Sequence, residues 1–425
     1  MKFILRRALL VLLLVISTGV LVSPHALAQP APSGASAFAH VQHLAGVIGP
    51  RVAGTAGERQ AAEYLAGQLR QYGYSVEFHS FPFPFFEARQ VQVQIAGASP
   101  RSITAQALLL SAATPAAGTE AEIVPAGLGR PEDFEGKRMT GAIALVERGT
   151  TTFREKATNA AARGAIAVIV YNNQPGIIVG TLGRPSDIPA VAIAQEDGKQ
   201  LVEAAQRGPV RLRLLVDTVN ETRSTVNVVA TKRGTTRPEE IIVVGGHYDS
   251  VPGSPGANDN ASGTAATLEA ARVLSGVSMA RTVQFVLFAA EELGLFGSAA
   301  FASERRQGIV AMINSDMVGW GERLMVGNAT GPDTAILTTA AQVAQRLGIQ
   351  VTRTRASSSD HTSFERAGVP AVFIHRGVDP HYHRPTDVPA NVEARHLEEA
   401  ARLIVGLVQE LTGMRSGGVV RPARS

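Results

Sequence analysis

The chain contains no cysteine among its 425 residues, and only 18% of its residues are charged. Without cysteine, neither a disulfide framework nor a lipid-modified cysteine anchor can form. Stability must therefore come from a hydrophobic core or from bound metal. Hydrophobic residues make up 45% of the chain, which is typical of a soluble globular protein. The length predicts two or three domains.

The sequence also lacks a basic patch, although its formal net charge is +4. Three basic residues lie at positions 2–7, and three arginines lie within residues 414–425. Without these two groups, the body of the chain has two more acidic than basic residues. We therefore expect no nucleic-acid partner and no attraction to anionic membranes.

The first residues are MKFILRRALLVLLLVISTGVLVSPHALAQP, in which a basic start precedes an apolar run and the small residues Ala26 and Ala28. This order is typical of a secretory signal peptide, so we predict that residues 1–28 are removed and that the protein is secreted, either extracellular or periplasmic. An uncleaved membrane anchor is the alternative. After cleavage we expect no stable membrane association. Residues 414–425 are predicted to form a flexible basic tail.

Histidine is absent from residues 99–222, where short β-like runs such as GAIALVER and GAIAVIVYNN dominate. Acid–base or metal chemistry centred on histidine therefore cannot lie in this stretch. We predict that residues 99–222 form a separate, β-rich inserted domain. Residues 29–98 and 223–413 are predicted to form one discontinuous domain around it.

The fold class is predicted to be α/β, with a mostly parallel central sheet sandwiched by helices. From residue 224 onward, strand-like runs alternate with helical ones, and the apolar runs indicate strands buried on both faces. Upstream, VEFHSFPFPFF and ARQVQVQIAG alternate like two strands, the first broken at Pro82 and Pro84. In such folds the ligand site lies beyond the carboxyl ends of the strands.

Acidic and imidazole side chains follow several of the predicted strands. The residues at these positions are His247, Asp249, Glu291, Glu292, Asp316, His381, Tyr382 and His383, with Asp259 on a loop before a helix. Each has an ordinary explanation when taken alone, since Asp259 or Asn260 could cap a helix and paired glutamates could interact with a helix dipole. Taken together, imidazole and carboxylate ligands without cysteine suit zinc, and a bridging carboxylate would suit two ions.

The motifs GGHYDSV, GANDNASG, AAEELGLFGS, INSDMVGW, SSSDHTSF and YHRPTDV occur in this order. They resemble the successive motifs of the co-catalytic di-zinc aminopeptidases, a broad family that also includes glutamate carboxypeptidase and the transferrin receptor ectodomain. The resemblance covers about residues 36–95 and 224–412. The middle block resembles the protease-associated (PA) domain inserted in many members, with Thr151 where that pattern often has cysteine.

The resemblance implies two zinc ions per chain. His247 and Asp316 would hold one ion, Glu292 and His383 would hold the other, and Asp259 would bridge them. His383 is preferred to His381 because HRPTD, which ends at Asp387, fits the family's His-x-x-x-Asp pattern.

The resemblance also implies roles for residues that are not ligands. Asp249 would orient the imidazole of His247, Glu291 would be the general base, and Tyr382 would stabilise an oxyanion. Asp360 and His361 match a segment near the substrate cleft. His375 and His396 are interpreted as structural or surface residues.

These roles predict a secreted metallo-aminopeptidase that hydrolyses N-terminal peptide bonds of peptides or proteins with a zinc-activated water. A carboxypeptidase or dipeptidase of the same fold is the main alternative, and it would need a cationic clamp such as Arg353, Arg355 or Arg376. Glutaminyl cyclase, which resembles this fold but uses one zinc, is a further alternative. A serine hydrolase is disfavoured because G-x-S-x-G does not occur. A non-enzymatic binding ectodomain is disfavoured because every motif position is filled. The oligomeric state, the side-chain preference and the role of the PA-like domain stay open.

Overall fold

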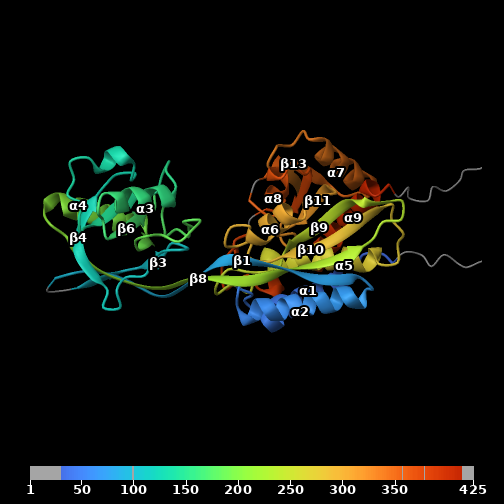
Figure 1. Cartoon of the computed structure of the whole chain (residues 1–425), viewed down its shortest axis with the longest axis horizontal. Coiled ribbons are helices and arrows are strands. Elements are labelled where there is room, and N and C mark those ends of the chain that lie inside the picture. The colour runs from blue at the N-terminus through green and yellow to red at the C-terminus, as the bar shows by residue number, and fades with distance from the viewer. Residues whose placement is uncertain (1–29, 98–99, 357, 378, 414–425) are drawn as a thin grey trace, which may run out of the picture.

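The computed structural model describes residues 30–97, 100–356, 358–377 and 379–413. The predicted signal peptide and basic tail lie outside the described residues. Within the described part of the chain, no helix has both the length and the apolar character needed to cross a bilayer. The described residues form two lobes joined by a pair of long strands (Figure 1).

A mostly parallel sheet forms the centre of the larger lobe. Strands β14, β11, β9 and β10 lie side by side in this order and are parallel. Beyond β14, the antiparallel strand β12 carries the edge strand β13. These strands span Arg237–His247 (β9), Arg281–Phe288 (β10), Ile309–Ser315 (β11), Leu324–Asn328 (β12), Val351–Arg355 (β13) and Ala371–His375 (β14). The carboxyl ends of four neighbouring strands therefore meet at one edge of the sheet.

Helices cover both faces of this sheet, which confirms the predicted α/β sandwich (Figure 1). One face packs against a core to which five helices contribute: α1 (Gly34–Val41), α2 (Ala56–Gln71), α5 (Gly263–Leu274), α7 (Ala335–Arg346) and α9 (Ala394–Leu411). The other face packs against α6 (Phe296–Glu304) and α8 (His361–Arg366). There the rings of Phe288, Phe301 and Phe364 contact one another.

The connection between the lobes is a ribbon of two long strands, β1 (Ser75–Ile95) and β8 (Arg211–Lys232), which pair antiparallel along almost their whole length. The prediction of two strands, the first of them broken at Pro82 and Pro84, is wrong, because both runs belong to β1 and both prolines lie inside it. The two prolines are two residues apart, so their missing N–H groups face the same side of the strand. Over this stretch, β8 is the only described strand that pairs with β1. An open strand edge tolerates proline in this way.

The smaller lobe is β-rich, as expected. Strands β4 (Thr119–Pro125), β5 (Ile143–Glu147), β6 (Ala167–Tyr171) and β7 (Ala190–Ile193) are parallel, and β3 (Ala105–Ala107) adds an antiparallel edge. Alternate residues of these strands enter two hydrophobic clusters on opposite faces. Helix α3 (Phe153–Ala162) covers one cluster and α4 (Gln195–Arg207) covers the other. The short strand β2 (Arg101–Ile103) pairs with the end of β1.

Candidate metal centre

Two clusters of metal-ligand residues lie at the carboxyl edge of the larger sheet, and they share Asp259. One contains His247, Asp259 and Asp316, and the other contains Asp259, Glu292 and His383, with the ligand atoms of each cluster within 4.8 Å of one another. Nε2 of His247 lies 3.2 Å from Oδ1 of Asp259 and 3.5 Å from Oδ1 of Asp316. Nε2 of His383 lies 3.1 Å from Oδ2 of Asp259 and 3.0 Å from Oε2 of Glu292. The two oxygens of Asp259 thus face different imidazoles.

The sheet topology brings these side chains together from distant parts of the chain. His247 is the last residue of β9, and Asp316 directly follows β11. Glu292 follows β10 after a short turn, and β9 lies between β10 and β11. Asp259 comes from the helical turn Ala257–Ser262, and His383 comes from the loop after β14. In the structure these side chains lie together at the ends of neighbouring strands, as predicted.

Buried hydrogen bonds fix the loop that carries Asp259. The carboxylate of Asp387 accepts the backbone N–H groups of Asn258, at 2.8 Å, and Asp259, at 3.0 Å. The Asn258 side chain donates to the carboxylate of Asp379, in the loop that carries His383. Asn258 and Asp379 were not singled out from the sequence. No spacing signal marks them, because the two residues meet only after folding.

Close backbone packing around Asp259 requires glycine at two positions. A Cβ atom at Gly246 would lie 2.3 Å from a carbonyl oxygen of β11, and one at Gly256, where φ is +60°, would lie 2.3 Å from the carbonyl oxygen of Asp259. The capping alternative applies to Asn260, whose Oδ1 accepts the N–H of Gly263 at 2.8 Å. The Asp259 carboxylate instead faces the imidazoles.

Asp249 lies on the other side of the His247 ring. Its Oδ1 is 3.4 Å from Nδ1 of His247. Its two oxygens also accept the backbone N–H groups of Glu291, at 3.2 Å, and Glu292, at 3.3 Å. One buried carboxylate therefore contacts both the imidazole and the turn that holds the paired glutamates.

The charges in the site favour a cation. Burial and the neighbouring Asp259 raise the pKa of Glu292 to about 7. Burial alone would lower the pKa of His383, but the carboxylates of Asp259 and Glu292 raise it to about 10. Burial would likewise lower the pKa of His247, yet nearby carboxylates raise it well above its ordinary value. The acidic side chains thus hold positive charge on both rings, as they would hold a metal ion.

Whether these residues fit a metal can be judged from their unpaired polar atoms. Several of the candidate ligand residues have a buried nitrogen or oxygen atom without a hydrogen-bond partner among the described residues. Nε2 of His383, Oε1 of Glu292 and Oδ1 of Asp316 are buried without a hydrogen bond to the described residues. The close contacts of His383 Nε2 therefore lack hydrogen-bond geometry. Buried polar atoms are normally satisfied, so their convergence indicates a site for cations. Imidazole nitrogen and carboxylate oxygen are zinc ligands, and the residues fit zinc.

Glu291 and Glu292 are adjacent, but their side chains have different surroundings. Oε2 of Glu292 contacts His383, whereas the carboxylate of Glu291 approaches His247 only to 4.0 Å. Burial raises the pKa of Glu291 well above its ordinary value, and nearby Asp360 adds to this increase. A carboxyl group with a raised pKa that lines a cavity is suited to accept and return a proton.

A cavity of about 350 Å³ opens onto both clusters. Apart from the acidic residues and His247, its walls are formed by Met317, Arg355, Ala356, Ser358, Phe373, His375 and Tyr382. Tyr382 stacks on the ring of His383 at a centroid distance of 3.7 Å. His381 lies outside both clusters, and its Nδ1 contacts the hydroxyl of Thr386 at 3.0 Å.

Asp360 and His361 lie behind the wall of this cavity and are not among the residues that line it. Burial raises the pKa of Asp360 to about 7. The His361 ring stacks on the Phe373 ring at a centroid distance of 4.5 Å, and its Nε2 atom lies 2.9 Å from the carbonyl oxygen of Ala356. His375, interpreted from the sequence as structural or surface-exposed, stacks on the same phenylalanine and lines the cavity.

Arg51 is a buried cation near the site that was not singled out from the sequence. Its guanidinium donates to five backbone carbonyl groups, including those of Tyr248 and Gly256 on the loop around the clusters. Burial lowers the pKa of Arg51 to about 10, against the opposing effect of nearby carboxylates, chiefly Asp249. Arg51 is therefore charged at neutral pH. A single arginine in a loop before a helix carries no sequence signal of burial.

The three arginines considered as carboxylate clamps lie in different environments. Arg376 is buried and pairs with Glu399. Arg353 projects from β13 and donates to the hydroxyl of Thr338 at 3.2 Å. Only Arg355, at the end of β13, lines the cavity.

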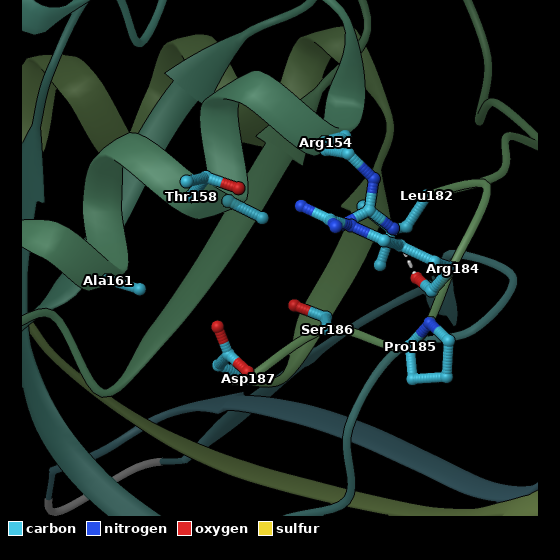
Figure 2. Close-up of a pocket in the computed structure, with 9 residues that line it drawn as sticks. Arg154, Thr158, Ala161, Leu182, Arg184, Pro185, Ser186 and Asp187 are labelled. Atoms are coloured by element: carbon cyan, nitrogen blue, oxygen red, sulfur yellow. Dashed lines mark hydrogen bonds between the residues drawn. The ribbon is translucent and has the colours of Figure 1, made fainter.

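A second cavity, of about 270 Å³, lies in the smaller lobe between α3 and residues 182–187 (Figure 2). The Arg154 and Arg184 side chains lie together at one end of it, and Ser186 and Asp187 lie at the other. Among the described residues that line it, Asp187 is the single carboxylate and there is no histidine. This cavity therefore does not offer the ligand set of the larger one.

Comparisons with known proteins agree with this architecture. Residues 227–408 match peptidase family M28, and residues 110–201 match the PA domain. The chain is similar to aminopeptidase YwaD of Bacillus subtilis, with 35% identity over 392 residues that cover 88% of this chain and 84% of that protein. Among solved structures, it is similar to the aminopeptidase from Aneurinibacillus sp. strain AM-1 (33% identity, TM-score 0.82, 89% of this chain and 94% of that one). It is also similar to BSAP, a zinc aminopeptidase from Bacillus subtilis (33% identity, TM-score 0.79, 90% and 96%). The chain therefore belongs to peptidase family M28, carries a PA domain and is a hydrolase that acts on peptide bonds.

Proposed function

We propose that the protein is a secreted zinc aminopeptidase that hydrolyses the N-terminal peptide bond of peptides or proteins. The observation that carries this proposal is the pair of ligand clusters that share Asp259, with Glu291 beside them in one cavity. The similarity to YwaD and BSAP supports aminopeptidase activity and zinc. The signal-like sequence of residues 1–28 supports secretion.

In the proposed site, His247 and Asp316 would hold one zinc ion and Glu292 and His383 would hold the other, with Asp259 contributing to both clusters. When bound there, two zinc ions supply Lewis acidity toward the scissile carbonyl and lower the pKa of the attacking water. Asp249 keeps the His247 ring in its ligating orientation through Nδ1.

The proton transfers are assigned to Glu291. Its carboxylate accepts the proton of the attacking water and returns it to the leaving amine. The hydroxyl of Tyr382, on the cavity wall, donates a hydrogen bond to the oxyanion of the tetrahedral intermediate. The cavity carboxylates also attract the protonated α-amine of the substrate, which directs the reaction to the N-terminal bond.

We also infer that residues 29–98 and 223–413 form the peptidase domain and that residues 99–222 form the PA domain. Separate hydrophobic clusters in the two lobes support this division. The two family matches, 227–408 and 110–201, each fall inside one of the inferred domains.

A chelation experiment tests the proposed function. Leucyl-anilide and its N-acetylated form are offered to the enzyme as purified, after treatment with a chelator, and after readdition of zinc. We expect cleavage of the free-amine substrate alone, loss of activity on chelation, and recovery with zinc. Activity confined to peptides with a free C-terminal carboxylate and a blocked amine would instead indicate a carboxypeptidase.

A further inference from the structure

The cavity wall carries a cationic side chain that the proposed mechanism does not use. Arg355 is the last residue of β13 and lines the same cavity as Asp259, Glu291 and Glu292. It is the sole arginine or lysine among the described residues that line this cavity. It forms no ion pair with the described part of the chain. Its charge is therefore available to a ligand.

Hydrogen bonds hold Arg355 in place at this position. Its Nη2 atom donates to the carbonyl oxygen of Thr330 at 3.0 Å. The carboxylate of Glu365 on α8 accepts from the backbone N–H of Thr330, at 3.1 Å, and from its hydroxyl, at 2.8 Å. Asn328 holds the same turn by accepting the N–H of Gly331 at 2.8 Å. One guanidinium N–H is thus used to fix the side chain, and the other donors have no hydrogen-bond partner among the described residues.

The rest of the cavity indicates what this cation would bind. The acidic side chains of the two clusters line this cavity, and Met317, Ala356 and Phe373 add apolar surface to its wall. A negatively charged substrate group would be repelled by the acidic side chains, and Arg355 is the group that can draw it to a defined place. A guanidinium binds a carboxylate through two parallel hydrogen bonds.

We propose that Arg355 binds a carboxylate of the substrate and gives the enzyme a preference for peptides with negative charge near the scissile bond. This inference rests on the proposed aminopeptidase function. The carboxylate can belong to the side chain of an N-terminal aspartate or glutamate, or to the C-terminus of a dipeptide. Both sources present the same chemical group, and the apolar residues of the cavity wall also accommodate neutral side chains.

Two substrate pairs that differ in one charge test this proposal. Glutamyl-anilide and glutaminyl-anilide differ in the side-chain carboxylate, and leucyl-glycine and leucyl-glycinamide differ in the terminal one. We expect kcat/KM of the wild type to favour the charged member of at least one pair. Arg355→Ala should lower that preference about tenfold, because a charge-assisted hydrogen bond is lost. Arg355→Lys should restore part of it, since it keeps the charge but not the planar fork.

Arg353→Ala is the matched control, because Arg353 lies on the same strand outside the cavity and should keep both wild-type ratios. The responding pair identifies the source of the carboxylate. If the wild type and Arg355→Ala both cleave the neutral substrates and have equal kcat/KM ratios for the charged and neutral members of each pair, the role of Arg355 is overturned. The proposed aminopeptidase function is not affected by that result. A wild type that cleaves none of the four substrates would contradict the proposed function and this inference with it.

Discussion

The carboxylate of Asp249 lies 3.4 Å from Nδ1 of His247, on the side of the ring opposite to the ligand cluster. Nε2 of the same ring faces Asp259 and Asp316. Because Asp249 also accepts the N–H of Glu291, it links the proposed metal ligand to the proposed base. The arrangement implies that Asp249 affects metal binding without touching the metal.

We predict that Asp249→Asn weakens zinc binding about 10–100-fold, because a neutral amide supports the ligating imidazole less well than a carboxylate does. Competition with a chromophoric chelator measures this affinity. Asp217→Asn, at an exposed position of β8, is the control and should bind zinc as the wild type does. Equal zinc affinity in Asp249→Asn and the wild type would show that Asp249 does not support the ligating imidazole.

The adjacent glutamates offer a second test, since each can be changed to the isosteric amide. Glu291→Gln should retain metal but lower kcat about 10²–10⁴-fold, because the proton acceptor is lost. Glu292→Gln should lose zinc from the site that contains His383. Metal content and turnover are measured on the same preparations. The opposite pattern would show that the two roles are exchanged.

Arg51 should be important for stability, because it is a buried charge that five carbonyl groups solvate. We expect Arg51→Met to lower the free energy of unfolding by about 3–5 kcal/mol, since the carbonyl groups and the nearby carboxylates lose their partner. Arg51→Lys should have an intermediate free energy of unfolding, because lysine keeps the charge but lacks the planar guanidinium and its five N–H donors. Arg59→Met, at an exposed position of α2, should change stability by less than about 0.5 kcal/mol. Denaturant unfolding of all four proteins checks this, and a stable Arg51→Met protein would contradict it.

His40 should make the fold sensitive to acid. The His40 ring is buried, with Nδ1 at 2.7 Å from the hydroxyl of Tyr64 and Nε2 at 3.1 Å from the hydroxyl of Tyr72. Burial lowers the pKa of His40 to about 4. In the unfolded chain the ordinary value is about 6.5. Between these values the unfolded chain binds a proton that the folded chain does not, so stability is lost as the pH falls from 6.5 toward 4.

We predict that His40→Gln reduces this acid sensitivity. The difference in the free energy of unfolding between pH 7 and pH 4.5 should be smaller by about 2 kcal/mol in the variant, because glutamine does not titrate. Both proteins are measured without metal, so that loss of zinc at low pH does not contribute. The same pH dependence in the two proteins would show that His40 is not the group responsible.

The arrangement of the candidate site could be predicted from the sequence because parallel strands end at one edge of a sheet. His247 and Asp316 each follow an apolar run that forms a buried parallel strand, and their convergence follows from that topology. The sandwich fold was predictable for the same reason. The glutamates after β10 follow the same rule.

Other features depend on contacts that no local pattern encodes. Pro82 lies inside a strand because the edge of β1 that does not pair with β8 is open at this position. Which strand edges are open is decided only when the whole sheet has formed. Arg355 reaches the cavity whereas Arg376 is buried against Glu399, and sequence spacing does not distinguish them. Arg51 is buried only because the distant loop of residues 248–256 packs against it. In each case the deciding contact joins residues far apart in the chain.

Metal content is the most direct measure of whether two ions share Asp259. Zinc per chain is measured by elemental analysis after dialysis, for the wild type and for Asp259→Ala. We expect two zinc ions per wild-type chain and loss of both tightly bound ions in the variant, because Asp259 belongs to both clusters. One ion or none in the wild type, or two retained in Asp259→Ala, would contradict it.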